Sequence, residues 1–107
     1  MDLNDKQEEK EMALIKEIIL KNGIPVNYHR IVSVNNITNS ESIIEIGRYI
    51  SKAKREEEKQ ALLNGDSMDI FIDTDYKNVP YDKNLNVDTA YELLKTDEDY
   101  LGAEDDL

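Results

Sequence analysis

The feature that most constrains the fold is a pair of segments in which apolar and other residues alternate, separated by turn-forming residues. In the first segment Ile24, Val26 and Tyr28 occupy every second position, and the apolar pattern continues to residue 34 through an expected bulge. The second segment, residues 43–50, is rich in β-branched side chains. A period of two is that of a β-strand, and the Asn, Ser and Thr residues between the segments favour a turn. The two segments therefore predict an antiparallel hairpin.

The segment before this hairpin carries its apolar residues at helical spacing. Residues 5–21 begin with Asp5, a suitable N-cap, and are followed by Asn22 and Gly23, which favour a helix stop. The apolar stripe consists of Met12, Leu14, Ile15, Ile18 and Ile19. We therefore expect residues 1–22 to form an N-terminal amphipathic helix. Its stripe packs either on the domain's own sheet or on a partner.

The remainder of the chain predicts one α+β domain over residues 23–96, followed by an acidic tail over residues 97–107. The expected elements after the hairpin are a helix at 52–63, a strand at 67–74, a loop at 76–85 and a helix at 88–95. In the tail we expect one helical turn and then fraying, so that the tail is dispensable for folding. The predicted fold class is α+β, a small antiparallel sheet or open sandwich of three to four strands with N-terminal and C-terminal helices.

Charge is distributed unevenly along the chain. The formal net charge is −11, and residues 66–107 hold 13 of the 24 acidic residues but only three of the 13 basic ones, a local charge of −10. The one basic cluster, Lys52, Lys54 and Arg55, is followed at once by three glutamates. We therefore expect no binding to nucleic acid or to an anionic membrane surface. A partner with a basic surface, or divalent cations between carboxylates, remains open.

Several functions are disfavoured by residue types that are missing or out of place. The sequence has no cysteine and one histidine, His29, which excludes thiolate chemistry and two-histidine metal sites. His29 has no nucleophile motif near it, so we interpret it as a packing residue. Asp73 and Asp75 could begin a calcium loop, but Lys77 and Asn78 stand where that loop needs an oxygen ligand and a glycine. We expect no enzymatic activity, no catalytic residue, no metal and no cofactor. The acidic N-terminal residues predict no secretory signal, and the apolar runs are too short to cross a bilayer.

Two stretches of the sequence together carry a family resemblance. The first is residues 22–31, Asn-Gly-Ile-Pro-Val-Asn-Tyr-His-Arg-Ile, joined to residues 49–56. The second is residues 90–96, Ala-Tyr-Glu-Leu-Leu-Lys-Thr, with residues 99–105, Asp-Tyr-Leu-Gly-Ala-Glu-Asp. This layout resembles small accessory proteins encoded in tail and baseplate modules of phages and prophages of low-GC Gram-positive bacteria. The resemblance implies a structural protein that is made in the bacterial cytoplasm and incorporated into a virion or phage-tail-like particle. Its partners would be other tail or baseplate proteins and further copies of itself.

On this reading the chain acts through protein–protein interfaces. The candidate interface residues are Met12, Ile15 and Ile19, from the apolar stripe of the predicted helix, and Tyr76 and Tyr81, the aromatic residues that we expect to be exposed in the loop. The other interpretation of these residues is packing in the domain's own core or within the loop. The alternative function is that of a small acidic inhibitor or regulator that binds a basic protein surface.

Overall fold

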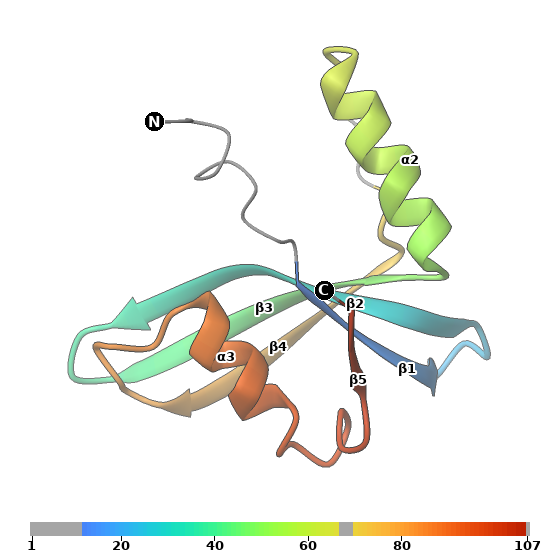
Figure 1. Cartoon of the computed structure of the whole chain (residues 1–107). Coiled ribbons are helices and arrows are strands. Elements are labelled where there is room, and N and C mark those ends of the chain that lie inside the picture. The colour runs from blue at the N-terminus through green and yellow to red at the C-terminus, as the bar shows by residue number, and fades with distance from the viewer. Residues whose placement is uncertain (1–11, 67–69, 107) are drawn as a thin grey trace.

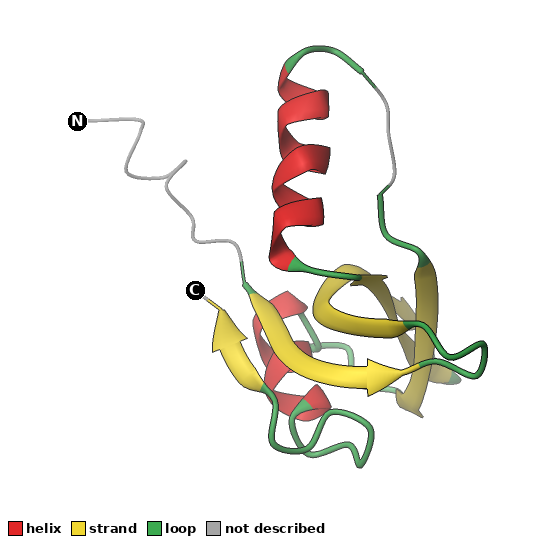
Figure 2. Cartoon of the chain, turned by 90° about the vertical axis from the view of Figure 1, so that its right-hand side faces the viewer, coloured by secondary structure: helices red, strands yellow, loops and turns green. Residues whose placement is uncertain are grey.

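The computed structural model describes residues 12–66 and 70–106. Its centre is an antiparallel sheet of five strands in the order β4-β3-β2-β1-β5 (Figure 1). The elements along the chain are β1 (Ala13–Ile19), β2 (Pro25–Ile37), β3 (Glu41–Tyr49), α2 (Lys52–Leu63), β4 (Asp73–Pro80), α3 (Val87–Leu94) and β5 (Glu104–Asp106). Helix α3 packs on one face of the sheet, whereas α2 stands away from the sheet on the other side (Figures 1 and 2).

The predicted hairpin is confirmed as β2 and β3. The two strands pair from Tyr28↔Tyr49 to Ile37↔Glu41, with an irregularity between Ile31 and Ser33 where the bulge was expected. The connecting turn places Asn39 at a φ of 60°, a left-handed conformation that asparagine tolerates better than most residues. The alternation of apolar residues in this part of the sequence therefore corresponds to the two paired strands β2 and β3.

The prediction of a helix over residues 5–21 is wrong for the part that the structure describes, and residues 5–11 lie outside the described residues. Residues 13–19 form β1, which pairs with β2 on one side and β5 on the other. The register shifts between Ile15 and Ile18, so the alternation of the strand is interrupted after its third residue. That interruption produces the three- and four-residue spacing typical of a helix. Asn22 and Gly23 do form a turn, with Gly23 at a φ of 86°, but the turn joins two strands.

The C-terminal third of the chain also differs from expectation. The strand predicted at 67–74 lies at 73–80 instead, so the first half of the loop expected at 76–85 belongs to strand β4. Residues 67–69 lie outside the described residues. The helix predicted at 88–95 is confirmed as α3, and Asn86 and Thr89 form its capping box. Where a helical turn was expected, residues 98–102 form hydrogen-bonded turns without a helix, and the expected fraying is wrong, because residues 104–106 form β5 against β1.

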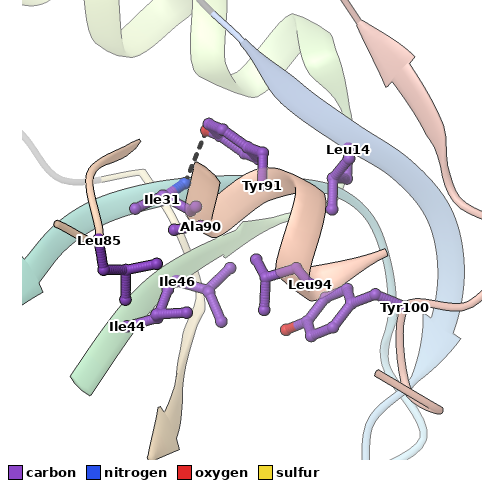
Figure 3. Packing of buried hydrophobic residues seen from close by; sticks show 9 residues of the cluster. All are labelled: Leu14, Ile31, Ile44, Ile46, Leu85, Ala90, Tyr91, Leu94 and Tyr100. Atoms are coloured by element: carbon purple, nitrogen blue, oxygen red, sulfur yellow. Dashed lines mark hydrogen bonds between the residues drawn. The ribbon is translucent and has the colours of Figure 1, made fainter. Parts of the chain in front are cut away.

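The main hydrophobic core lies between α3 and the sheet. It is built from buried residues of β1, β2, β3, α3 and the loops that flank α3, namely Leu14, Ile31, Ile44, Ile46, Leu85, Ala90, Tyr91, Leu94 and Tyr100 (Figure 3). The Tyr91 hydroxyl accepts a hydrogen bond from the Ile31 amide at 2.8 Å and donates one to the Met12 carbonyl at 2.7 Å. We call this side of the sheet the covered face. The fold is thus α+β as predicted, but the sheet is an open one of five strands, and its two helices are internal rather than terminal.

Candidate interaction surface

On the opposite side of the sheet, α2 and Phe71 lie against one end, at Tyr49. We call this side the open face; it carries Ile15, Tyr28, Glu45, Tyr49 and Tyr76, which alternate with residues of the covered face along the paired strands. The substantially exposed apolar side chains there include Ile15 at 39%, Val32 at 37% and Tyr76 at 59%, and Ile37, at 38%, lies on the same face at the end of the β2–β3 hairpin. Apolar side chains gathered on one uncovered sheet face are typical of a surface that binds another protein.

The centre of the open face depends on a glycine within a strand. A Cβ atom added at Gly47 would lie 3.1 Å from Cγ2 of Val32 and 3.3 Å from Cγ of Phe71. The absence of a side chain at Gly47 therefore allows Val32 and Phe71 to lie close over β3. Phe71 also contacts Tyr49 edge to face, with ring centroids 5.9 Å apart.

Polar side chains lie between these apolar ones. Glu45 accepts hydrogen bonds from the Ser33 hydroxyl at 2.8 Å and from the Tyr76 hydroxyl at 3.5 Å. The Asn78 amide donates to Glu41 at 2.7 Å. A mixture of exposed apolar groups and preorganised acceptors is the usual composition of a non-obligate interface.

Helix α2 is held to the open face by a buried polar cluster. The Tyr49 hydroxyl donates to Oε1 of Glu58 at 2.7 Å, Arg55 pairs with the same carboxylate, and the Ile70 amide donates to its other oxygen at 2.9 Å. Burial, together with the Glu58 carboxylate, raises the pKa of Tyr49 to about 12. Burial acts to raise the pKa of Glu58, but the Ile70 amide, Tyr49 and Arg55 outweigh it and hold that pKa below its usual value.

A second polar cluster lies on the covered face beyond α3. The Arg48 guanidinium pairs with Asp75 at 2.6 Å and donates to the Tyr100 hydroxyl, which itself donates to Asp75 at 2.8 Å. Burial raises the pKa of Tyr100, so its hydroxyl stays protonated at neutral pH. A cavity of about 460 Å³ opens beside this cluster, lined by residues 18–22, Arg48 and residues 73–75. Each charged or hydroxyl group of the cluster is engaged in a structural contact, so the arrangement stabilises the fold.

His29 is fully buried beside this cluster. Its Nε2 lies 2.7 Å from the Lys16 carbonyl, its ring contacts Tyr100 edge to face, and its Nδ1 has no hydrogen-bond partner. Burial lowers the pKa of His29, so the ring is neutral at pH 7 and Nε2 donates to the carbonyl. The interpretation of His29 as a packing residue agrees with this fully buried position.

The structure separates the five predicted interface residues. Ile15 and Tyr76 both lie on the open face, on different strands. Met12 is half-buried and packs against the core, Ile19 is exposed beside the cavity, and Tyr81 is half-buried after β4. Sequence reasoning missed Val32 and Phe71, although Gly47 inside a strand pattern was a signal of close approach at that point.

The acidic C-terminal segment is largely paired with bases. Lys77 contacts Asp97 at 3.3 Å and pairs with Asp99, Lys95 contacts Asp105 at 3.1 Å, and Lys52 contacts Asp106 at 3.0 Å. Lys77 and Lys95 are already counted in the charge of −10 of residues 66–107. That charge is reduced only by bases from outside the segment, such as Lys52 on Asp106 and Arg48 on Asp75. Within residues 12–66 and 70–106, histidine and carboxylate side chains form no group of three that could hold a metal ion.

The class that these features define is an open-sheet α+β protein with one uncovered sheet face. Neither of the two helices in the described part of the chain is long and apolar enough to cross a membrane. Comparisons of the chain with protein-family models, with curated proteins and with solved structures found no match.

Proposed function

We propose that this protein is a non-enzymatic structural component of a phage or phage-tail-like particle, and that it binds its neighbours through the open face of its sheet. The observation that carries the proposal is the set of exposed apolar side chains on that face, Ile15, Val32 and Tyr76. Tyr76 lies opposite Glu45, which already accepts a hydrogen bond from the Ser33 hydroxyl. The particle itself is inferred from the resemblance of residues 22–31, 49–56, 90–96 and 99–105 to tail and baseplate accessory proteins.

The experiment that tests this role is a search for the chain in purified particles. We expect particles induced from the host strain to contain the protein at a fixed ratio to the tail proteins, measured by quantitative mass spectrometry after density-gradient purification. An epitope-tagged copy should co-sediment with the particles and resist a high-salt wash, because apolar burial does not weaken with ionic strength. Particles that are complete and infectious without the protein, and that never contain it, would contradict the proposal.

A second candidate function is that of an acidic regulator bound to a basic protein surface. It is favoured by the net charge of −11. It is also favoured by the defined conformation of residues 97–106, which places their acidic side chains at fixed positions on the surface instead of on a frayed chain end. Against it, Asp97, Asp99, Asp105 and Asp106 already have basic partners within the chain. The two functions differ in salt dependence. Binding as an acidic regulator should weaken steeply between 50 and 300 mM salt, because the Debye length falls from about 14 to about 6 Å over this interval.

A further inference from the structure

Strand β4 forms one edge of the sheet. It pairs with β3 from Asp73↔Arg48 to Pro80↔Glu41, and among the strands that the structure describes none lies on its other side. Every second residue of an antiparallel edge strand points its N–H and C=O groups away from the sheet. An unpaired edge of this length is a template for a further strand, which many proteins prevent and others use for assembly.

The sequence of β4 is complementary to itself in one antiparallel register. Asp75 and Lys77 flank Tyr76, and both have their side chains on the covered face. If two copies of β4 run antiparallel with Tyr76 opposite Tyr76, Asp75 of each copy faces Lys77 of the other. A register centred on Asp75 or on Lys77 would instead place two like charges directly opposite each other, which is destabilising. Among the registers centred on Asp75, Tyr76 and Lys77, the charge pattern therefore favours the one centred on Tyr76.

The other residues of β4 fit the same register. Tyr76 is 59% exposed on the open face, so two tyrosine rings would meet across the two-fold axis. Thr74 would face Asn78, and both have side chains that form hydrogen bonds. Pro80, which has no N–H, stands at the end of the strand, beyond the residues that this register pairs.

We propose that two copies of this chain pair through β4 about a two-fold axis at Tyr76, so that their five-stranded sheets join into one continuous sheet. This pairing uses the edge of β4 and, of the exposed open-face side chains, only Tyr76, and it requires no particle protein. A monomeric protein would therefore not contradict the proposed function, and absence of the protein from particles would not contradict the pairing of β4.

Single cysteine substitutions test the register directly, because the chain has no cysteine of its own. Opposed residues of an antiparallel pair have Cα atoms about 4.5–5.5 Å apart, within the span of a disulfide. Tyr76→Cys protein, oxidised with glutathione disulfide at about 150 mM salt to screen the net negative charge, should form a covalent dimer. Glutathione disulfide takes up the two electrons and two protons that the paired thiols lose.

The matched controls are Thr74→Cys and Asn78→Cys on the same strand. Each alone should remain monomeric, because in this register neither thiol faces its own copy, whereas an equimolar mixture should cross-link. The Tyr76→Cys reaction should be about tenfold or more faster than that of either control alone, since pairing raises the effective thiol concentration. Thermal melting establishes that each variant is folded.

Three results would overturn the proposal. One is Tyr76→Cys protein that stays monomeric, and another is cross-linking of all three variants at the same rate. The third is native protein that light scattering finds monomeric up to millimolar concentration.

Discussion

At the scale of the residue, the buried polar groups show why composition alone was a poor guide to the interior. Arg48, Glu58 and His29 are all buried, although residues of these types are mostly found at the surface. Glu58 is held by Tyr49, Arg55 and Ile70, all within 12 residues along the chain. Arg48 and His29, in contrast, both contact Tyr100, which lies 52 residues after Arg48. No local pattern predicts a contact of that range, so these positions could not be identified from the sequence.

Stability should depend on pH through His29. Burial lowers the pKa of this histidine from its usual 6.5, so the unfolded chain binds a proton at a higher pH than the folded protein does. The free energy of unfolding should therefore fall as the pH drops below about 6.5, until the pKa of the folded state is reached.

The check is urea denaturation between pH 7.5 and 5 on the native protein and on the His29→Gln variant. Glutamine retains a donor for the Lys16 carbonyl but does not titrate. The variant should be less sensitive to pH over this interval. Equal pH dependence in the two proteins would show that His29 is not the group responsible.

Glu58, which holds α2 to the sheet, gives a prediction that has a control in the adjacent residue, Glu57. Glu58→Ala should lower the free energy of unfolding by about 3–5 kcal/mol, because it leaves Arg55 and the Tyr49 hydroxyl buried without this carboxylate. Glu57→Ala removes only an exposed pair with Lys54 and should change the free energy by less than about 1 kcal/mol. The comparison is made by denaturation in urea. Equal effects of the two substitutions would mean that the buried cluster does not hold the helix.

At the scale of the element, a strand was predicted correctly where the alternation of its apolar residues is regular. The β2–β3 hairpin was predicted because its alternation is long and its bulge short, whereas β1 was taken for a helix because a register shift interrupts a strand of only seven residues. Strand β4 reads DTDYKNVP and has a half-buried rather than a buried face, so its hydrophobic signal is weak. Strand β5 is acidic throughout, and only its pairing with β1 makes it a strand.

The C-terminal segment should therefore be required for folding, contrary to the expectation from its charge. Truncation after Thr96 removes β5 and Tyr100, which is fully buried and bonded to Arg48 and Asp75. Burial of one large apolar side chain contributes about 1.5–3 kcal/mol, and the buried Arg48 would also lose a partner. We expect the truncated protein to melt at least about 10 °C lower, or without cooperativity.

The control for this truncation is Leu101→Ser in the full chain, at a side chain that is 62% exposed. It should leave the melting temperature almost unchanged, since most of the Leu101 side chain already lies in solvent. A truncated protein that melts cooperatively within a few degrees of the native one would restore the earlier expectation of a dispensable tail.

At the scale of the whole molecule, the two faces of the sheet have different roles. The covered face contains the core with α3, and the open face keeps apolar side chains in reach of another protein. Two of the five interface residues predicted from the sequence, Ile15 and Tyr76, lie on this open face, but for a different reason from the one expected. Ile15 was assigned to a helix and Tyr76 to a loop, and both are strand residues.

The most direct test of the account is the affinity of the chain for the tail or baseplate proteins encoded beside it. Ile15→Ser with Val32→Ser removes two apolar side chains from the open face, whereas Val87→Ser with Leu93→Ser removes two of similar exposure, 45% and 39%, from α3. Isothermal titration calorimetry should show binding by the native protein and the α3 double variant, with a loss of about tenfold or more in the open-face variant, equivalent to about 1.4 kcal/mol. Equal affinities for the two double variants, both shown by melting to be folded, would contradict the claim that the open face is the binding surface.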